Sequence, residues 1–287
     1  MKAPKFSYVR AESVGQVLQL LAEHGEEARI LAGGQSLMPT LNMRLSQPRL
    51  LIDINRLEPL KGISLQVGRV RIGAMARHTE VTSSPIVARH MLLIAEAMPH
   101  VAHVAVRNRG TFGGSIALAD PAAELPACAL ALDATIVVES TRGRREIAAR
   151  DYFQGLYATA RSPDELLVEV LIPLPTSNAV PVFMELARRH GDFAIAGLAF
   201  QLDMTGGRVA DGRLAYFASE EKPTLAPKAL AAIHGRRLGT DCAEAAAASL
   251  ADDLKPMSGP QGSAKLRLHL QRVLTRRALL LAATRAG

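Results

Sequence analysis

Hydrophobic and polar positions follow one another in this 287-residue chain with periods that change along its length. Apolar residues between positions 14 and 21 are spaced three and four apart, which predicts an amphipathic helix that Ser13 caps and Gly25 ends. Residues 28–31 and 50–54 are short apolar runs, and each predicts a buried strand. The chain therefore opens with helices and strands in alternation.

The same kinds of pattern continue to residue 172. Residues 63–67 and 70–72 alternate in polarity and flank Gly68-Arg69, which predicts a hairpin. Further helices are predicted at residues 37–43, 86–98 and 124–132, and further strands at residues 135–139 and 166–172.

Prolines interrupt the pattern after residue 172. Pro173, Pro175 and Pro181, with polar residues between them, are typical of a domain boundary. Beyond them the pattern predicts strands at 182–188, 194–204 and 208–216, a turn at Gly206-Gly207, and helices at 226–232, 241–253 and 263–284. The predicted fold class is α+β, with a larger domain at residues 1–176 and a smaller domain of three strands and three helices at residues 177–287.

Composition indicates a globular protein. The chain is 48% hydrophobic and 21% charged, which is enough apolar material for a sizeable core. No apolar run reaches the roughly 18 residues that a membrane-spanning helix needs. The N-terminus also lacks the apolar core of a signal peptide. These features predict a cytoplasmic protein.

Charge and cysteine content exclude several classes of function. The net charge of +7 would suit a nucleic-acid binder, but acidic residues are mixed with the basic ones and aromatic residues make up only 4% of the chain. Cys128 and Cys242 are the only cysteines, so we predict no metal site and no disulfide framework. The chain cannot hold an iron–sulfur cluster on four of its own thiolates. No catalytic acid–base group stands out.

Two glycine-rich stretches, about 80 residues apart, carry the candidate chemistry. They read Ala32-Gly33-Gly34-Gln35-Ser36 and Thr111-Phe112-Gly113-Gly114-Ser115. Glycine has no Cβ and tolerates positive φ, so successive backbone N–H groups can point into one concavity and bind an anion. Neither stretch fits the dinucleotide fingerprint G-x-G-x-x-G or the P-loop. As a pair, they favour two loops around one phosphate-bearing ligand.

The residues around both stretches resemble a known family. Segments 31–39 and 109–117 closely resemble the FAD-binding medium subunit of molybdenum hydroxylases, the group of xanthine dehydrogenase and aerobic carbon monoxide dehydrogenase. Further matches are segments 51–55, 72–75, 119–126 and 188–194. The resemblance runs over nearly the whole chain.

The resemblance implies a fold and a set of cofactor contacts. The fold is a vanillyl-alcohol-oxidase/PCMH-type FAD-binding domain, in which two α+β halves hold FAD between them, followed by the smaller domain. The implied FAD contacts are Ala32, Gly33, Gly34, Gln35, Ser36, Leu37, Thr111, Phe112, Gly113, Gly114, Ser115, Asp120, Glu124 and Leu167.

The resemblance assigns a part of FAD to some of these residues, and for others a purely structural role is the alternative. The two glycine stretches would hold the pyrophosphate. Asp120 and Glu124 match an acidic position near the sugar-like chain of the flavin, although either could simply be an acid at a helix N-terminus. Phe193 either flanks the flavin ring or packs in the core.

The resemblance also implies a function as an electron-transfer subunit. Substrate would be hydroxylated at a molybdenum–pterin centre on a large subunit, and two [2Fe–2S] clusters on a small subunit would pass electrons to FAD and then to an external acceptor. The implied assembly is a dimer of heterotrimers. Gln35 stands where carbon monoxide dehydrogenases tend to carry histidine, which favours an organic substrate such as an N-heterocycle. Ile195 stands where eukaryotic members carry a lysine near the flavin, which disfavours a strong NAD site.

Two other functions stay open at the level of sequence. One is a self-sufficient flavoprotein oxidase or reductase of the same fold, which would need an acid or base beside the flavin. The other is a scaffold protein with a degenerate nucleotide site, which would take up no FAD.

Overall fold

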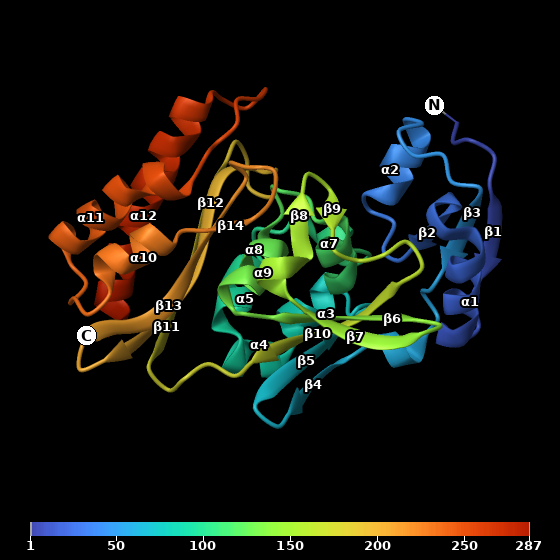
Figure 1. Cartoon of the computed structure of the whole chain (residues 1–287), viewed down its shortest axis with the longest axis horizontal. Coiled ribbons are helices and arrows are strands. Elements are labelled where there is room, and N and C mark those ends of the chain that lie inside the picture. The colour runs from blue at the N-terminus through green and yellow to red at the C-terminus, as the bar shows by residue number, and fades with distance from the viewer. Residues whose placement is uncertain (1, 287) are drawn as a thin grey trace.

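The computed structural model describes residues 2–286, so Met1 and Gly287, at the outer ends of the two predicted domain ranges, lie outside the described residues. Three blocks follow one another along the molecule (Figure 1): a small sheet near the N-terminus, a larger sheet with helices in the middle, and a third sheet covered by the C-terminal helices. None of the helices in this range combines the length and hydropathy of a membrane-spanning segment.

The elements have the following bounds. The strands are β1 (Ser7–Arg10), β2 (Ala28–Leu31), β3 (Leu50–Asp53), β4 (Ile63–Gln66), β5 (Arg69–Gly73), β6 (Thr135–Ser140), β7 (Gly143–Ala148), β8 (Phe153–Gly155), β9 (Ala158–Thr159), β10 (Leu166–Pro173), β11 (Ala179–Ala187), β12 (Ala194–Thr205), β13 (Arg208–Phe217) and β14 (Thr224–Leu225). The α-helices are α1 (Val14–His24), α2 (Leu37–Asn42), α3 (His78–Ser83), α4 (Pro85–His90), α5 (Leu92–Ala97), α6 (Val104–Arg107), α7 (Phe112–Leu118), α8 (Glu124–Ala131), α9 (Ala149–Tyr152), α10 (Pro227–Ile233), α11 (Thr240–Asp253) and α12 (Ala264–Ala286).

The N-terminal block is a parallel sheet in the order β1-β3-β2. Helix α1 begins where the Ser13 hydroxyl accepts a hydrogen bond from the Gln16 N–H, and it ends at Gly25, as the sequence predicts. The helix buries Val17, Leu18 and Leu21 in one core with the strand residues. The parallel arrangement brings the carboxyl ends of β2 and β3 to one edge, where the first glycine stretch leaves β2.

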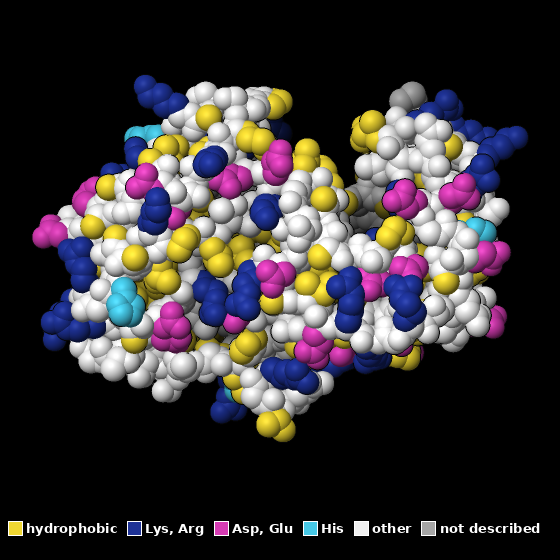
Figure 2. All heavy atoms as spheres, in the orientation of Figure 1, with side chains coloured by type: hydrophobic (Ala, Val, Ile, Leu, Met, Phe, Trp, Pro, Cys, Tyr) yellow, Lys and Arg dark blue, Asp and Glu magenta, His cyan; other side chains and the backbone are white. Residues whose placement is uncertain are grey.

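The middle block is an antiparallel sheet in the order β4-β5-β10-β6-β7. Helices α7 and α8 share its core, which includes the fully buried Phe112, Ile116 and Leu125. The second glycine stretch is therefore fixed to this sheet, while the first belongs to the N-terminal block. The space-filling view shows a deep hollow between these two blocks (Figure 2).

The C-terminal block is an antiparallel sheet in the order β11-β12-β13-β14 with α10, α11 and α12 packed on it. The three long strands and the three helices agree with the predicted pattern, and Gly206-Gly207 forms the turn with positive φ at both residues. The sheet has a fourth strand, β14, that the sequence prediction missed because it is only two residues long.

Two predicted elements of the middle block differ in the structure. The single helix expected at residues 86–98 is two helices, α4 and α5, separated at Met91, which has φ −124° and ψ 54°. The stretch at residues 111–115, expected as a loop, is the start of helix α7, with Thr111 as its N-cap. Two glycines in the first turn hid this helix because glycine is a poor helix former.

Candidate functional site

The two glycine stretches, far apart in sequence, meet in the structure. Gly33 is buried, and a Cβ on it would overlap the carbonyl oxygen of Arg109 and lie 2.9 Å from the Cα of Gly110. Only glycine allows the first stretch to approach the residues just before Thr111 this closely. The two stretches can therefore come together because position 33 has no side chain.

The first stretch presents a row of backbone N–H groups. Within residues 2–286, the N–H groups from Gly33 to Leu37 have no hydrogen-bond acceptor, whereas the next one, from Met38, binds the carbonyl of Gly34 at 3.0 Å. Gly34 has a φ of +73°, which turns the chain between β2 and α2. Successive N–H groups beside a residue of positive φ form an anion-binding concavity. We call residues 33–37 the cradle, because their backbone N–H groups have no acceptor in the described chain and can bind an anion.

From Phe112 onward, the N–H groups of the second stretch are bonded to acceptors within the protein. Phe112 and Gly113 donate to the carbonyls of Ala76 and Ala74, each at 2.9 Å. Gly114 donates to the Thr111 hydroxyl at 3.1 Å. The sequence predicts free donors from both stretches, but in the described chain this helical turn supplies a wall of small side chains instead.

Gly113 explains the close fit of that wall. A Cβ at this position would lie 2.6 Å from both Cα and Cβ of Ala74, so the helix can lie against the end of β5 only with glycine there. Gly114 and Ser115, by contrast, are only half-buried. The wall is thus held rigidly by the middle sheet.

Asn55 and Arg77 complete the cradle, although no sequence pattern predicts a role for either of them. The Asn55 amide donates to the carbonyl of Ala32 at 2.9 Å, and the guanidinium of Arg77 donates to both the Asn55 side-chain oxygen and the carbonyl of Arg109. Asp53 accepts the Asn55 backbone N–H at 2.8 Å. Segment 51–55 was part of the family resemblance, but only the fold reveals what its side chains contact.

The carboxylate of Asp53 anchors this network. Burial alone would raise its pKa, but hydrogen bonds from Tyr8 and Asn55 outweigh burial and lower the pKa below its usual range. Asp53 is therefore ionised at neutral pH and holds Asn55 in a fixed orientation.

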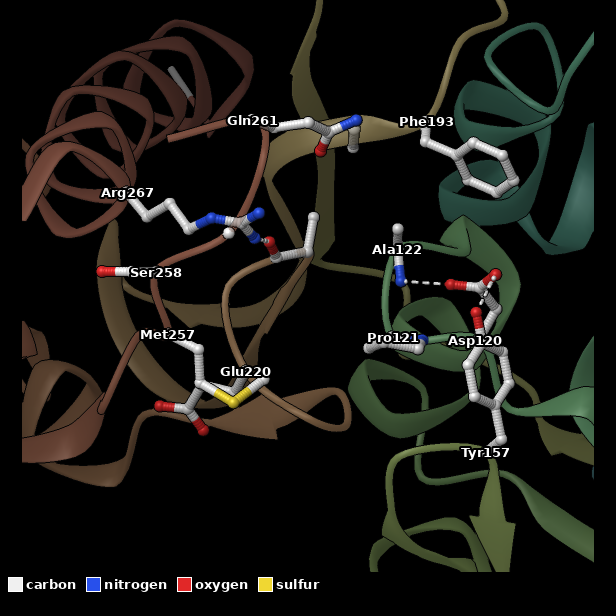
Figure 3. A pocket seen from close by; sticks show the side chains of 13 residues that line it. Asp120, Pro121, Ala122, Tyr157, Phe193, Glu220, Met257, Ser258, Gln261 and Arg267 are labelled. Atoms are coloured by element: carbon white, nitrogen blue, oxygen red, sulfur yellow. Dashed lines mark hydrogen bonds between the residues drawn. The ribbon is translucent and has the colours of Figure 1, made fainter. Parts of the chain in front are cut away.

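Asp120 lies at the other end of α7, beside a pocket of about 340 Å³. Its carboxylate accepts the Ala122 N–H at 2.9 Å and the Tyr157 hydroxyl at 3.2 Å. Figure 3 shows Asp120, Tyr157 and Phe193 on the side of the middle block, facing Arg267 and Met257 from the C-terminal block. The pocket thus lies between the two larger blocks.

Phe193 is one of the pocket residues rather than a core residue. Its side chain is 60% exposed, and it precedes β12 instead of lying within it. Of the two interpretations that the sequence left open, the core aromatic is wrong.

Glu124 and Leu167 lie away from the pocket lining. Leu167 is buried in the core that also contains Phe112. Glu124 is buried at the start of α8, and burial, with the nearby charge of Glu185, raises its pKa to about 7. Glu185 in turn pairs with His100, whose Nδ1 lies 3.2 Å from a Glu185 carboxylate oxygen. Glu124 thus lies within the influence of Glu185, His100 and Asp120, but its side chain does not line the pocket.

The comparisons with known proteins identify the family. A family described as "FAD binding domain in molybdopterin dehydrogenase" matches residues 4–175, and one described as "CO dehydrogenase flavoprotein C-terminal domain" matches residues 181–282. The chain belongs to the FAD-binding medium subunits of molybdenum hydroxylases.

Individual relatives cover the whole medium subunit. The alpha subunit of the 6-hydroxypseudooxynicotine dehydrogenase complex of Paenarthrobacter nicotinovorans is 38% identical, over 100% of this chain and 97% of that protein. Quinoline 2-oxidoreductase from Pseudomonas putida 86 contains a chain that matches with a TM-score of 0.95 and 40% identity, over 100% of this chain and 99% of that chain. A chain of carbon monoxide dehydrogenase from Hydrogenophaga pseudoflava matches with a TM-score of 0.97 and 36% identity, over 100% of both chains.

These matches confirm the predicted function. This medium subunit is the FAD-carrying electron-transfer component of a multi-subunit molybdenum-containing oxidoreductase. They favour it over a self-sufficient flavoenzyme and over a scaffold protein.

Proposed function

We propose that the medium subunit binds FAD with its pyrophosphate in the cradle at residues 33–37 and its flavin ring at the pocket beside Asp120. The observation that carries this proposal is the row of five N–H groups without an acceptor in the described chain, which begins at Gly33, beside Arg109 and Gly110 just before the second glycine stretch. Ala32, Thr111 and Phe112 would shape the cradle, and Gly114 and Ser115 would face the phosphates.

The spacing along α7 supports this placement. The helix has seven residues, so at 1.5 Å per residue it spans about 10 Å between Thr111 and the segment that leads to Asp120. A five-carbon ribityl chain can cover a distance of this order. Asp120 would meet that chain, and Phe193 would lie at the ring. FAD contacts from Glu124 and Leu167 stay predictions, because neither side chain lines the pocket.

FAD, when bound, supplies a redox centre that exchanges electrons one or two at a time. The residues of this chain bind and orient it. The cradle N–H groups offset phosphate charge without lysine, the Asp53–Asn55 pair holds the first stretch in place, and Phe193 and Met257 line the pocket.

The proposal extends to the assembly. We place the FAD-binding domain at residues 1–176 and the second domain at residues 177–287, in a cytoplasmic dimer of heterotrimers. The partners would carry the molybdenum–pterin cofactor and two [2Fe–2S] clusters, which fits a chain with two cysteines. Gln35, and the likeness to a quinoline-oxidising enzyme, support an N-heterocyclic aromatic substrate on the large subunit.

A comparison of flavins tests the FAD site. FMN carries the same ring and ribityl chain but lacks the pyrophosphate, so it should bind the apo chain at least about 100-fold more weakly than FAD, since two lost charge-assisted hydrogen bonds at about 1.5 kcal/mol each correspond to this factor. ADP should compete with FAD. Equal affinities for FMN and FAD, measured by fluorescence titration, would contradict a site built around the pyrophosphate.

A further inference from the structure

The cradle is assembled from two separate parts of the fold. Its N–H donors belong to the stretch that follows β2 in the N-terminal parallel sheet. Its wall belongs to α7, which is fixed to the antiparallel sheet through Gly113 and Ala74. A cradle of this kind holds a diphosphate only if the two parts keep a fixed spacing, because hydrogen bonds weaken steeply with small displacements.

Arg77 links these two parts. It belongs to the middle block, just after β5, and its backbone N–H is held by the carboxylate of Glu80 at 2.7 Å. One Nη atom donates to the carbonyl of Arg109, and the other donates to the side-chain oxygen of Asn55. Arg109 is the residue that touches Gly33, and Asn55 is bound to the carbonyl of Ala32. One guanidinium therefore holds both residues that contact the start of the first stretch: Asn55, which binds Ala32, and Arg109, which lies against Gly33.

The contacts suit arginine and no other side chain. A guanidinium is planar and carries donors on two sides, so it can bridge two acceptors at a fixed spacing, whereas a lysine ammonium is a single point. Asn55 can accept from Arg77 only because its amide group faces the other way, toward the carbonyls of Ala32 and Leu31 and toward Asp53. The chain Asp53–Asn55–Arg77 thus transmits the position of the N-terminal sheet to α7.

We propose that Arg77 is a positioning residue that sets the spacing between the two glycine stretches and thereby determines FAD affinity. The inference rests on the FAD site proposed above. Arg77 acts through protein contacts, because each of its two Nη atoms donates to a protein acceptor, one to the carbonyl of Arg109 and one to Asn55. Its removal leaves the N–H groups of the first stretch intact but frees them to move relative to Gly114 and Ser115.

The test is a set of arginine variants of the full chain. Arg77→Met keeps the length of the stem and removes the bridge. Arg71→Met is the matched control, since Arg71 is also a largely buried arginine of this region and binds a carboxylate, Glu169, and the backbone carbonyls of Lys61 and Pro59, but does not touch either glycine stretch. Arg77→Lys keeps the charge but lacks the planar fork that holds two acceptors at a fixed spacing.

FAD dissociation constants, FMN dissociation constants and apo-chain melting temperatures are then measured for each variant. We expect Arg77→Met to weaken FAD binding at least tenfold more than Arg71→Met, to reduce the preference for FAD over FMN, and to lower the melting temperature no more than the control does. Arg77→Lys should lie in between. If Arg77→Met and Arg71→Met change FAD affinity equally, the proposal is overturned.

A glycine variant distinguishes failure of the positioning role of Arg77 from failure of the proposed FAD site. Gly34→Ala alters the N–H groups directly. If Gly34→Ala loses FAD and Arg77→Met does not, the positioning role alone is wrong. If neither variant loses FAD, the cradle is not the FAD site. Should Arg77→Met fail to fold, the FAD-to-FMN preference of Arg77→Lys decides the question.

Discussion

Replacing Gly34 with alanine tests the cradle at its turn. The residue has a φ of +73°, and an added Cβ would lie 3.2 Å from Leu31 Cδ1 and 3.2 Å from Met38 Cγ. An L-residue in this conformation costs about 1–2 kcal/mol, and the two side-chain neighbours resist relaxation around the new methyl group. The chain should rotate out of this conformation, and the N–H groups of Gly34 and Gln35 should turn away from their common direction.

The expected magnitude follows from those two donors. Each hydrogen bond to a charged acceptor contributes about 1.5–3 kcal/mol, so losing two should weaken FAD binding by a factor of roughly 10² to 10⁴. Gly68→Ala is the matched control, because Gly68 has a φ of +70° and no atom within 4 Å of the added Cβ. It introduces the same backbone strain in the hairpin between β4 and β5, away from the cradle.

The assay combines a fluorescence titration of apo protein with FAD and a urea unfolding curve for each variant. Gly34→Ala should lose at least as much unfolding free energy as Gly68→Ala, and only Gly34→Ala should lose FAD. If the two variants bind FAD within threefold of each other, backbone donors at residues 33–37 do not hold the pyrophosphate.

Three further changes probe other parts of the site. Glu124→Gln should stabilise the chain at pH 8 but not at pH 5. Folding raises the pKa of the Glu124 carboxyl from 4.5 to about 7, so the protonated carboxyl favours the folded state fully below pH 4.5. This contribution of about 3 kcal/mol to the free energy of unfolding is lost as the pH rises through 7, and glutamine does not lose it. Parallel urea unfolding at the two pH values checks it, and an equal difference between variant and parent at both would argue against a buried ionisable Glu124. Thr111→Val removes the acceptor of the Gly114 N–H and should cost about 1 kcal/mol of unfolding free energy, whereas no loss would show that the cap is dispensable. Phe193→Ala should change stability by less than about 0.5 kcal/mol but alter the absorption band of bound flavin, and a loss of several kcal/mol would mean that the ring is part of the core after all.

The sequence predicts most of the helices and strands because the residues that define each of them are neighbours in the chain. Ser13 caps α1, and the alternation around Gly68 gives the β4–β5 hairpin, in each case through residues within a few positions of one another. The break at Met91 has no such signal, since neither proline nor glycine marks it. Strand β7 was missed because four of its six residues are exposed and it has little apolar alternation.

The candidate site also has parts that the sequence predicts and parts that only the fold reveals. The two glycine stretches could be found by composition, but their meeting depends on the contact of Gly33 with Arg109, which are 76 positions apart. The roles of Asn55 and Arg77 arise only when two sheets come together, so no window of sequence contains them. The start of α7 was hidden because burial of Phe112 and Ile116 stabilises a turn that two glycines disfavour.

The most direct measurement of the whole account is purification of the tagged chain from its own cells at native abundance, followed by mass spectrometry and cofactor analysis of the complex. The account predicts one FAD per chain, together with a large subunit containing molybdenum and a small subunit containing four iron atoms as two [2Fe–2S] clusters. A chain that purifies without such partners and turns over a small-molecule substrate by itself would contradict it.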